Sequence, residues 1–225
     1  KKFAITYDTS SYGLGNADDF EKEVKKNGGE VLFKDGVQVG QRDFTAMLTK
    51  IKQLNPEVIY YGGVAAEAAL IRKQMDDLKI GAIFTGVSGL NSETYQQLAG
   101  PCAEGTIINY GGKDVSELPD GQAFIKKYQE AGFKEPYQAY GPYAYDAANI
   151  IIEALKKVGP DKKGLVEEIR KAQHSGVLGK TSFDEYGDTT NTQIITTAVS
   201  QDGKWIPWEK SDYAKGTKKL PFVKQ

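Results

Sequence analysis

An alternation of short apolar runs and amphipathic segments over the first 110 residues constrains the fold of this chain more than any other feature. The apolar runs have the length and composition of buried strands, and they lie at 2–6, 30–33, 57–61, 82–85 and 106–110. The amphipathic segments between them are typical of helices. Strands separated by helices form a parallel sheet, with right-handed crossovers that cover both faces. We therefore predict a doubly wound parallel α/β sheet.

The expected helices carry capping signals at their ends. Asn16 is placed to cap the first helix, and Asp18 and Asp19 would then lie in its first turn, where negative charge is favourable. The NGG sequence at 27–29 stops that helix, and Asp43 is placed to cap the next one. These signals set the expected helix boundaries.

The composition excludes several classes of function. The chain has 225 residues and a formal net charge of −1, so it lacks the electrostatic footprint of a nucleic-acid-binding protein. Its single cysteine and single histidine argue against an internal disulfide, a metal centre and a catalytic triad. No apolar run approaches the roughly 18 residues that span a bilayer. We expect no enzyme activity, metal or cofactor, and the start directly in a strand predicts a processed or truncated chain.

The pattern changes after residue 112. Residues 120–172 are typical of helices throughout, with no strand between them. Such helices are hard to place on the preceding sheet, because both of its faces already carry helices. Part of 113–191 is therefore expected to belong to a second lobe whose sheet lies elsewhere. Near the end of the chain, the pair Asp202–Gly203 between alternating apolar and polar residues predicts a β-hairpin.

Ligands of an open doubly wound sheet bind outside the carboxyl ends of the strands, near the point where the strand order switches. This rule selects three loops, at 8–15, 62–67 and 86–91, which follow the first, third and fourth expected strands. Each loop holds glycines, which let a ligand approach the backbone. Tyr12 and Ser88 are the side chains that stand out in the first and third of these loops.

Two other uses of the first loop are less well supported. A dinucleotide fingerprint needs a glycine directly after the strand and a small residue where Asp18 stands, although Asp35 suits a ribose. A phosphoacceptor role for Asp8 lacks the paired acids and the lysine loop of such domains. We interpret Asp8 as a turn residue.

Six stretches carry a family resemblance: FAITYDTSSYGLG, VIYYGG, TGVSGLNS, AEGTI, PYAYDAANIIIEAL and GKTSFDEYGDTTN. In order and spacing they resemble the leucine/isoleucine/valine-binding protein family, the type I periplasmic solute-binding proteins of ABC importers. The resemblance implies two α/β lobes that close on a ligand like a Venus flytrap. It assigns 1–112 and 192–225 to the second lobe, and 113–191 to the helices and one strand of the first lobe. The N-terminal part of the first lobe is expected to be absent from this sequence.

The resemblance also implies a ligand-binding site. Tyr12 matches a family tyrosine that contacts the ligand side chain, and Tyr140 matches an aromatic residue that closes the same pocket. Gly63 and Val64 follow the third expected strand, and Val64 stands where relatives often have a ligand-contacting tyrosine. Ser88 stands where they have an acid that pairs with the α-ammonium of the ligand. These five residues are the expected ligand-binding set.

The implied function is that of an extracytoplasmic receptor, periplasmic or extracellular and in some cases lipid-anchored. It would deliver a small solute to an ABC permease after lobe closure. Ser88 offers no charge to a buried ammonium, so we predict that an aromatic or aliphatic carboxylate is preferred to an amino acid. An amino acid stays open as the ligand, because an acid from the absent part of the first lobe would replace the lost partner. The alternative is a ligand-sensing domain of a receptor or regulator with the same fold.

An incomplete first lobe has a consequence for its surface. Helices in 113–191 that lack their sheet are expected to expose apolar faces, which promote association. Phe124, Ile150, Ile151 and Leu155 are the expected members of these faces.

Overall fold

A computed structural model describes residues 1–112, 114–118, 120–137, 139–190 and 195–221. The chain forms two compact units: unit 1 comprises Lys1–Tyr110 and Thr196–Gln225, and unit 2 comprises Gly111–Ile195. The expected lobe boundaries after residues 112 and 191 adjoin residues that lie outside the described part of the chain. Each unit is therefore described by itself.

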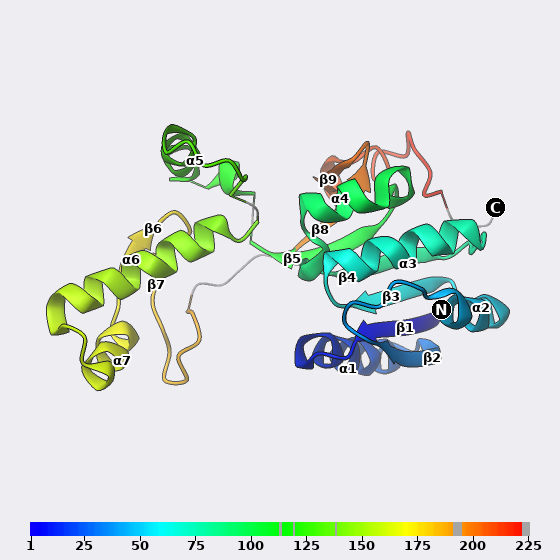
Figure 1. Ribbon diagram of the computed structural model, residues 1–225, viewed down its shortest axis with the longest axis horizontal. Coiled ribbons are helices and arrows are strands. Elements are labelled where there is room, and N and C mark those ends of the chain that lie inside the picture. The colour runs from blue at the N-terminus through cyan, green and yellow to red at the C-terminus, as the bar shows by residue number, and fades with distance from the viewer. Residues whose placement is uncertain (113, 119, 138, 191–194, 222–225) are drawn as a thin grey trace. The chain divides into compact units, whose positions relative to one another are not determined.

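Unit 1 is built on a sheet whose strand order, within the described residues, is β2-β1-β3-β4-β5-β8-β9 (Figure 1). The neighbours from β2 to β5 pair in parallel, and β8 and β9 pair antiparallel. The doubly wound parallel sheet expected from the sequence is confirmed. The strands are β1 (Lys2–Asp8), β2 (Glu30–Val37), β3 (Val58–Gly62), β4 (Ile83–Val87), β5 (Ile107–Gly111), β8 (Ile195–Gln201) and β9 (Lys204–Pro207).

Helices cover both faces of this sheet (Figure 1). On one face, Ala17 and Phe20 of α1 pack against Ile5 and Tyr60, and the rings of Phe20 and Tyr60 stack with centroids 3.8 Å apart. The other three helices pack on the opposite face. The helices of unit 1 are α1 (Ser11–Lys26), α2 (Thr45–Leu54), α3 (Ala65–Asp77) and α4 (Glu93–Ala99).

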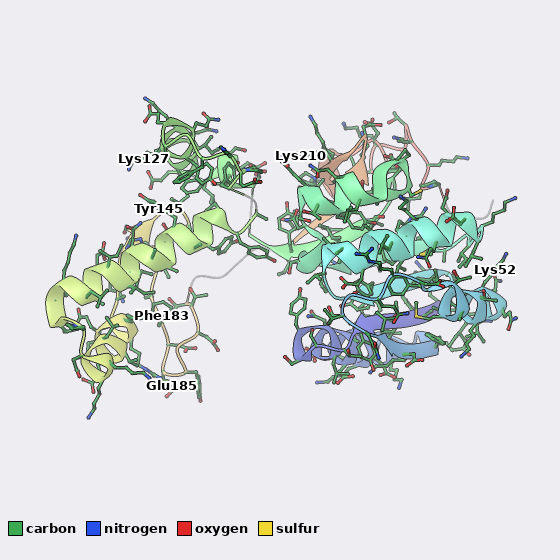
Figure 2. The ribbon with its side chains drawn as sticks, viewed as in Figure 1. Lys52, Lys127, Tyr145, Phe183, Glu185 and Lys210 are labelled. Atoms are coloured by element: carbon green, nitrogen blue, oxygen red, sulfur yellow. The ribbon has the colours of Figure 1, made fainter. Side chains whose placement is uncertain are left out.

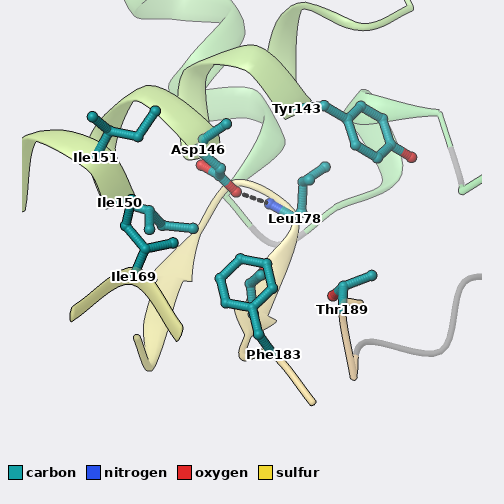
Figure 3. A pocket seen from close by; sticks show the side chains of 10 residues that line it. Tyr143, Asp146, Ile150, Ile151, Ile169, Leu178, Phe183 and Thr189 are labelled. Atoms are coloured by element: carbon teal, nitrogen blue, oxygen red, sulfur yellow. Dashed lines mark hydrogen bonds between the residues drawn. The ribbon is translucent and has the colours of Figure 1, made fainter. Parts of the chain in front are cut away.

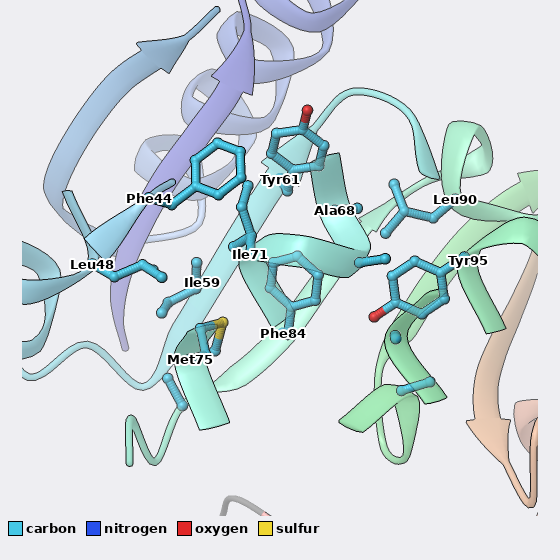
Figure 4. Close-up of a cluster of buried hydrophobic side chains, with 14 of the residues drawn as sticks. Phe44, Leu48, Ile59, Tyr61, Ala68, Ile71, Met75, Phe84, Leu90 and Tyr95 are labelled. Atoms are coloured by element: carbon cyan, nitrogen blue, oxygen red, sulfur yellow. The ribbon is translucent and has the colours of Figure 1, made fainter. Parts of the chain in front are cut away.

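The main core of unit 1 lies between the sheet and α2, α3 and α4 (Figure 4). Ile59 and Phe84 from the strands meet Leu48, Ile71 and Met75 from the helices, and all five side chains are fully buried. Burying side chains of this size stabilises a fold by roughly 1.5–3 kcal/mol each relative to exposure. This core holds the strand ends, and hence the loops that follow them, in fixed positions.

The first helix begins earlier than its capping signals predict. Helix α1 starts at Ser11, and the hydroxyl of Ser10 caps it by accepting from the Gly13 N–H at 3.1 Å. The prediction of Asn16 as N-cap is therefore wrong. Gly13 and Gly15 in the first two turns disfavour a helix on propensity alone, but Gly13 packs against the neighbouring loop backbone and tertiary contact overrides the propensity.

The expected hairpin near the end of the chain is confirmed. Strands β8 and β9 are joined by Asp202 and Gly203, which both have positive φ, 52° and 76°. That is the backbone of a two-residue hairpin turn with an Asp-Gly sequence. Its strands extend the parallel sheet at the β5 edge, where the Ser200 N–H donates to the Thr106 carbonyl at 2.8 Å.

Unit 2 consists of helices and one small hairpin in its described residues (Figure 1). The expectation of one strand in this region is wrong: two short strands pair antiparallel, because the chain turns back at residues 177 and 178. Rings of Phe124 on α5 and Tyr145 on α6 meet edge to face at 5.4 Å, and Figure 2 shows Tyr145 on its helix. The elements are α5 (Gly121–Glu130), α6 (Gly141–Val158), α7 (Lys162–Arg170), β6 (His174–Gly176) and β7 (Gly179–Thr181).

The expectation of exposed apolar faces in unit 2 is half right. Ile151 and Leu155 are 43% and 38% exposed, as predicted. Phe124 and Ile150 are buried, so their inclusion is wrong. Phe124 packs with Val177 of the β6–β7 turn, a contact that sequence periodicity does not reveal. Unit 2 therefore has a small core of its own beside an exposed apolar face.

Candidate functional site

The candidate site lies at the carboxyl ends of β1, β3 and β4. The sheet order reverses between β1 and β3, because β2 lies on one side of β1 and all later strands lie on the other. Ligands of open α/β sheets bind at such a switch point. Tyr12 follows β1 and occupies the first turn of α1, where its side chain is 41% exposed. The switch point thus presents an aromatic side chain to solvent.

Two further loops reach the same point. Gly63 is buried directly after β3, and Val64 is the exposed N-cap of α3. Ser88 begins a short 3-10 turn, Ser88–Leu90, directly after β4. The hydroxyls of Tyr12 and Ser88 lie 3.5 Å apart, close enough for a long hydrogen bond. A methyl group added to Gly89 would come within 2.3 Å of the Gly63 carbonyl oxygen, so these loops are in direct contact.

The structure therefore brings together Tyr12, Gly63, Val64 and Ser88 in unit 1. Tyr140 lies in unit 2, as the residue that precedes α6, and it is 55% exposed. Its ring centroid is 6.3 Å from that of Tyr143, whose hydroxyl donates to the Gly111 carbonyl at 3.1 Å. The roles of these residues in ligand binding stay predictions.

A buried polar group lies beneath the loops and was missed by the sequence interpretation. Asp8 is 2% exposed, and its Oδ1 accepts from the Ser10 N–H at 3.0 Å and from the Ser10 hydroxyl. Its burial makes it unsuited to a phosphoacceptor role. The signal in the sequence was an acid two residues before a helix-capping serine, at the end of a buried strand.

Tyr61 and Glu67 complete this polar layer. The Tyr61 hydroxyl has no hydrogen-bond partner among the described residues, and Figure 4 shows it pointing away from Phe84 and Met75. Burial raises the pKa of Tyr61 far above its ordinary value, and the charges of Glu67 and Asp8 add to the effect. Tyr61 therefore stays protonated and neutral. Oε1 of Glu67 accepts from the Gly40 N–H at 2.7 Å.

The exposed groups at this point are suited to binding a small solute. Among the described residues, no three His, Cys, Asp or Glu side chains gather in a way that could hold a metal ion. The groups that face solvent are hydroxyls, an aromatic ring and a small apolar side chain, and these suit a small solute with an apolar body.

Unit 2 contains a separate apolar pocket of about 410 Å³ (Figure 3). Ile150, Ile151 and Ile169 line it on the helix side, and Phe183 lines it on the side of the chain that follows β7. Asp146 also lines it, and its carboxylate accepts from the backbone N–H groups of Val177 at 2.9 Å and Leu178 at 2.8 Å. The sequence interpretation did not predict this pocket, because its lining comes from segments far apart in the chain.

Comparison with known proteins places the chain in a family. A family model described as periplasmic binding protein matches residues 1–204. The chain therefore belongs to the periplasmic binding protein family, which confirms the resemblance seen in the sequence. Within the described residues, no helix is long and apolar enough to cross a membrane.

Several individual proteins of known name or structure are similar to this chain. The Leu/Ile/Val-binding protein homolog 1 of Brucella melitensis is 38% identical over 189 residues, which cover 83% of this chain and 50% of the relative. The leucine binding protein LivK of Thermotoga maritima has a similar structure, with a TM-score of 0.81 and 25% identity over 92% of this chain and 59% of that one. LivJ of Streptococcus pneumoniae, solved with isoleucine, has a TM-score of 0.78 and 26% identity over 91% and 58%. The chain spans about half the length of the curated relatives it matches.

Proposed function

We propose that this chain is part of an extracytoplasmic solute-binding receptor of an ABC importer, which binds a small amino acid or related organic acid and closes around it. The observation that carries the proposal is the meeting of the Tyr12 and Ser88 hydroxyls beside Gly63 at the switch point of the sheet. Membership of the periplasmic binding protein family supports it. So do the names of the relatives, which bind leucine or isoleucine or are called Leu/Ile/Val-binding homologues.

Five residues form the proposed ligand contacts. Tyr12 provides an aromatic wall, Ser88 a hydroxyl, and Gly63 and Val64 a surface where the ligand approaches the backbone. Tyr140 of unit 2 closes the pocket in the liganded state. Closure follows from differential binding, because a ligand held by both units favours the closed arrangement. The protein then acts as a receptor for a permease and not as an enzyme, in the periplasm or outside the cell, with or without a lipid anchor.

The proposed ligand is an aromatic or aliphatic carboxylate in preference to an amino acid. An ammonium group removed from water needs a charged partner or several acceptors. Around the site, Ser88 offers one neutral hydroxyl and Val64 offers no polar side-chain atom. Asp8, which lies beneath these loops, is buried and already accepts two hydrogen bonds from Ser10. An amino acid would bind only if another part of the receptor supplied the missing acid.

The units are proposed to correspond to lobes: 1–112 with 192–225 to the second lobe, and 113–191 to the C-terminal portion of the first. Three observations support this assignment. The chain divides into two compact units near these positions, unit 2 has an exposed apolar pocket, and the relatives are about twice as long as the matched region. Ile151 and Leu155 would then pack against the rest of the first lobe, and in its absence they favour association.

The ligand proposal is tested by calorimetry with L-leucine, L-valine and benzoate, up to millimolar concentrations. We expect benzoate to bind with a lower dissociation constant than either amino acid. Ser88→Ala should weaken binding severalfold, because one hydrogen bond contributes about 0.5–1.5 kcal/mol. Tyr12→Ala should weaken it more, since a ring and a hydroxyl are lost together. Tyr186→Ala, at an 80% exposed tyrosine of unit 2, is the control and should bind as the unchanged chain does. Tight leucine binding that Ser88→Ala leaves unchanged would contradict both the ligand preference and the role of Ser88.

The lobe proposal is tested by sedimentation. Leu155→Lys should reduce self-association, because it places a charge in the exposed apolar face of α6. Leu54→Lys is a matched control, since Leu54 of unit 1 is 40% exposed and Leu155 is 38% exposed. Equal effects of the two substitutions, or a chain that stays monomeric at all concentrations, would argue against an incomplete lobe.

A further inference from the structure

The three loops of the candidate site touch one another through glycine backbone. A methyl group on Gly13 would lie 2.7 Å from the Gly62 carbonyl oxygen, and one on Gly62 would lie 2.8 Å from the Gly13 carbonyl oxygen. A methyl group on Gly89 would lie 2.3 Å from the Gly63 carbonyl oxygen and 3.2 Å from the Tyr12 hydroxyl. Such separations leave no room for any side chain. The loops after β1, β3 and β4 are therefore in close backbone contact, so a displacement of one loop moves the others.

Asp8 is buried beneath these three loops and contacts two of them. Its Oδ1 holds Ser10, and the Ser10 hydroxyl in turn caps α1 at the Gly13 N–H, at 3.1 Å. A methyl group on Gly63 would meet Asp8 Oδ2 at 2.7 Å and the Tyr61 hydroxyl at 2.5 Å. One buried carboxylate thus contacts both the first turn of α1, which carries Tyr12, and the loop that follows β3.

We propose that Asp8, Gly13, Gly63 and Gly89 are positioning residues, which hold the Tyr12 and Ser88 hydroxyls at their 3.5 Å separation. The effect on Tyr12 follows from the contacts alone, whereas the effect on ligand affinity rests on the proposed function. Gly15 provides the contrast within the same helix. Apart from the neighbouring backbone of its own helix, a methyl group there would meet no atom of the described residues within 4 Å.

The test places 3-fluorotyrosine at position 12 and records its ¹⁹F resonance in the folded protein. Gly13→Ala, Gly63→Ala, Gly89→Ala and Asp8→Asn should each shift this resonance, and Gly15→Ala should leave it in place. Ser88→Ala calibrates the shift that follows from losing the neighbouring hydroxyl. A substitution that only weakens the fold lowers the melting temperature but leaves the resonance of the folded state unchanged. If Gly63→Ala does not fold, Asp8→Asn and Gly89→Ala decide the question. An unmoved resonance in the folded variants overturns the inference.

Affinity gives a second and separable readout. With benzoate as the probe in calorimetry, the positioning variants should bind about tenfold more weakly or worse, because small displacements of contact groups are costly, while Gly15→Ala should bind normally. If the resonance shifts but benzoate affinity does not change, the loops do not position the site and the inference fails. If the unchanged chain binds none of benzoate, L-leucine and L-valine, the proposed function fails, and the ¹⁹F resonance alone still decides whether these residues position Tyr12.

Discussion

Units 1 and 2 bury their helices in different ways. In unit 1, Ile71 of α3 is fully buried against Ile59 and Phe84 of the sheet. In unit 2, no residue of α7 is fully buried among its described residues, and α6 leaves Ile151 and Leu155 exposed. Both sets of helices are amphipathic, so pattern alone does not distinguish them. The difference teaches that an apolar helix face needs an opposing layer, which the parallel strands supply in unit 1 and an eight-residue hairpin cannot supply in unit 2.

Unit 2 compensates in part with a polar contact. The carboxylate of Asp146 is 2% exposed and accepts from the N–H groups of Val177 and Leu178, which ties α6 to the β6–β7 hairpin. Gly176 permits this contact, since a methyl group there would lie 2.3 Å from Asp146 Oδ1. Unit 1 is thus held chiefly by apolar packing, and unit 2 depends more on a few specific hydrogen bonds.

The largest expected effect tests the difference in apolar packing between the two units. Ile71→Ala should lower the free energy of unfolding of unit 1 by about 2–5 kcal/mol, because it leaves a cavity in a closed core. Ile151→Ala, the same change at a 43% exposed position of unit 2, should alter stability by only about 0.5 kcal/mol or less. Both tryptophans, Trp205 and Trp208, lie in unit 1, so fluorescence-monitored denaturation reports on that unit.

Circular dichroism followed in the same denaturation includes the helices of both units. Coincident fluorescence and dichroism curves would mean that the units unfold together, and the contrast between them would then be one of packing only. A large loss of stability in Ile151→Ala would contradict an open apolar face on α6.

The second prediction tests the contribution of the Asp146 hydrogen bonds to unit 2. Asp146→Ala should destabilise unit 2 by about 1–3 kcal/mol, because two backbone N–H groups lose their buried acceptor. His174 is the chain's one histidine, and its Nε2 lies 3.8 Å from Asp146 Oδ1, so its imidazole NMR signals report on this contact. We expect those signals to move while the tryptophan fluorescence of unit 1 stays unchanged.

Asp120→Ala is the control for this experiment. Asp120 is exposed at the start of α5, and its side chain makes no capping hydrogen bond there. Its replacement should leave the imidazole signals in place. An Asp146→Ala variant as stable as the unchanged chain would show that the hairpin is held by packing instead.

Sequence patterns predicted unit 1 better than unit 2 for a physical reason. Strand and helix periods in unit 1 come from local alternation, and the hairpin at Asp202–Gly203 is specified by the turn residues themselves. The start of α1 could not be predicted in the same way. The Asn16 signal was sound on propensity, but Gly13 contacts Gly62, which lies 49 residues further along the chain, and a local pattern cannot reveal such a contact.

In the candidate site too, features set by the order of elements were predicted, and features set by distant contacts were not. The switch-point rule selected the loops that carry Tyr12, Gly63 and Ser88, because the rule depends only on the order of elements. Asp8 was taken for a turn residue, since its burial and its contacts with two loops appear only when the strands are assembled. The burial of Phe124 was missed for the same reason, because it depends on the distant residue Val177.

The smallest expected effect compares one ion pair in each unit. Hydrogen bonds from Lys25 and then Lys34 lower the pKa of Glu21 below its ordinary value of 4.5, and Lys34 joins β2 to α1 through this contact at 2.6 Å. In unit 2, a hydrogen bond from Lys157 lowers the pKa of Glu168, and this pair joins α6 to α7 at 2.8 Å. A lowered folded-state pKa means that the unfolded chain binds more protons in acid.

Each carboxylate therefore adds stability that is fully present above its unfolded pKa, near 4.5, and is lost as the pH falls through the lower folded value. Glu21→Gln should cost less than about 1 kcal/mol at neutral pH, because the pair is partly exposed and screened by solvent. The cost should vanish below the folded pKa, where glutamate is also neutral.

Glu168→Gln should likewise lower the stability of unit 2 at neutral pH and lose this effect in acid. The signals of His174 follow this change, and tryptophan fluorescence should change little if unit 2 unfolds by itself. Glu30→Gln, at an exposed position of β2, is the control. Equal loss of tryptophan-monitored stability in Glu21→Gln and Glu168→Gln would mean that the two units share one cooperative transition, despite their different cores.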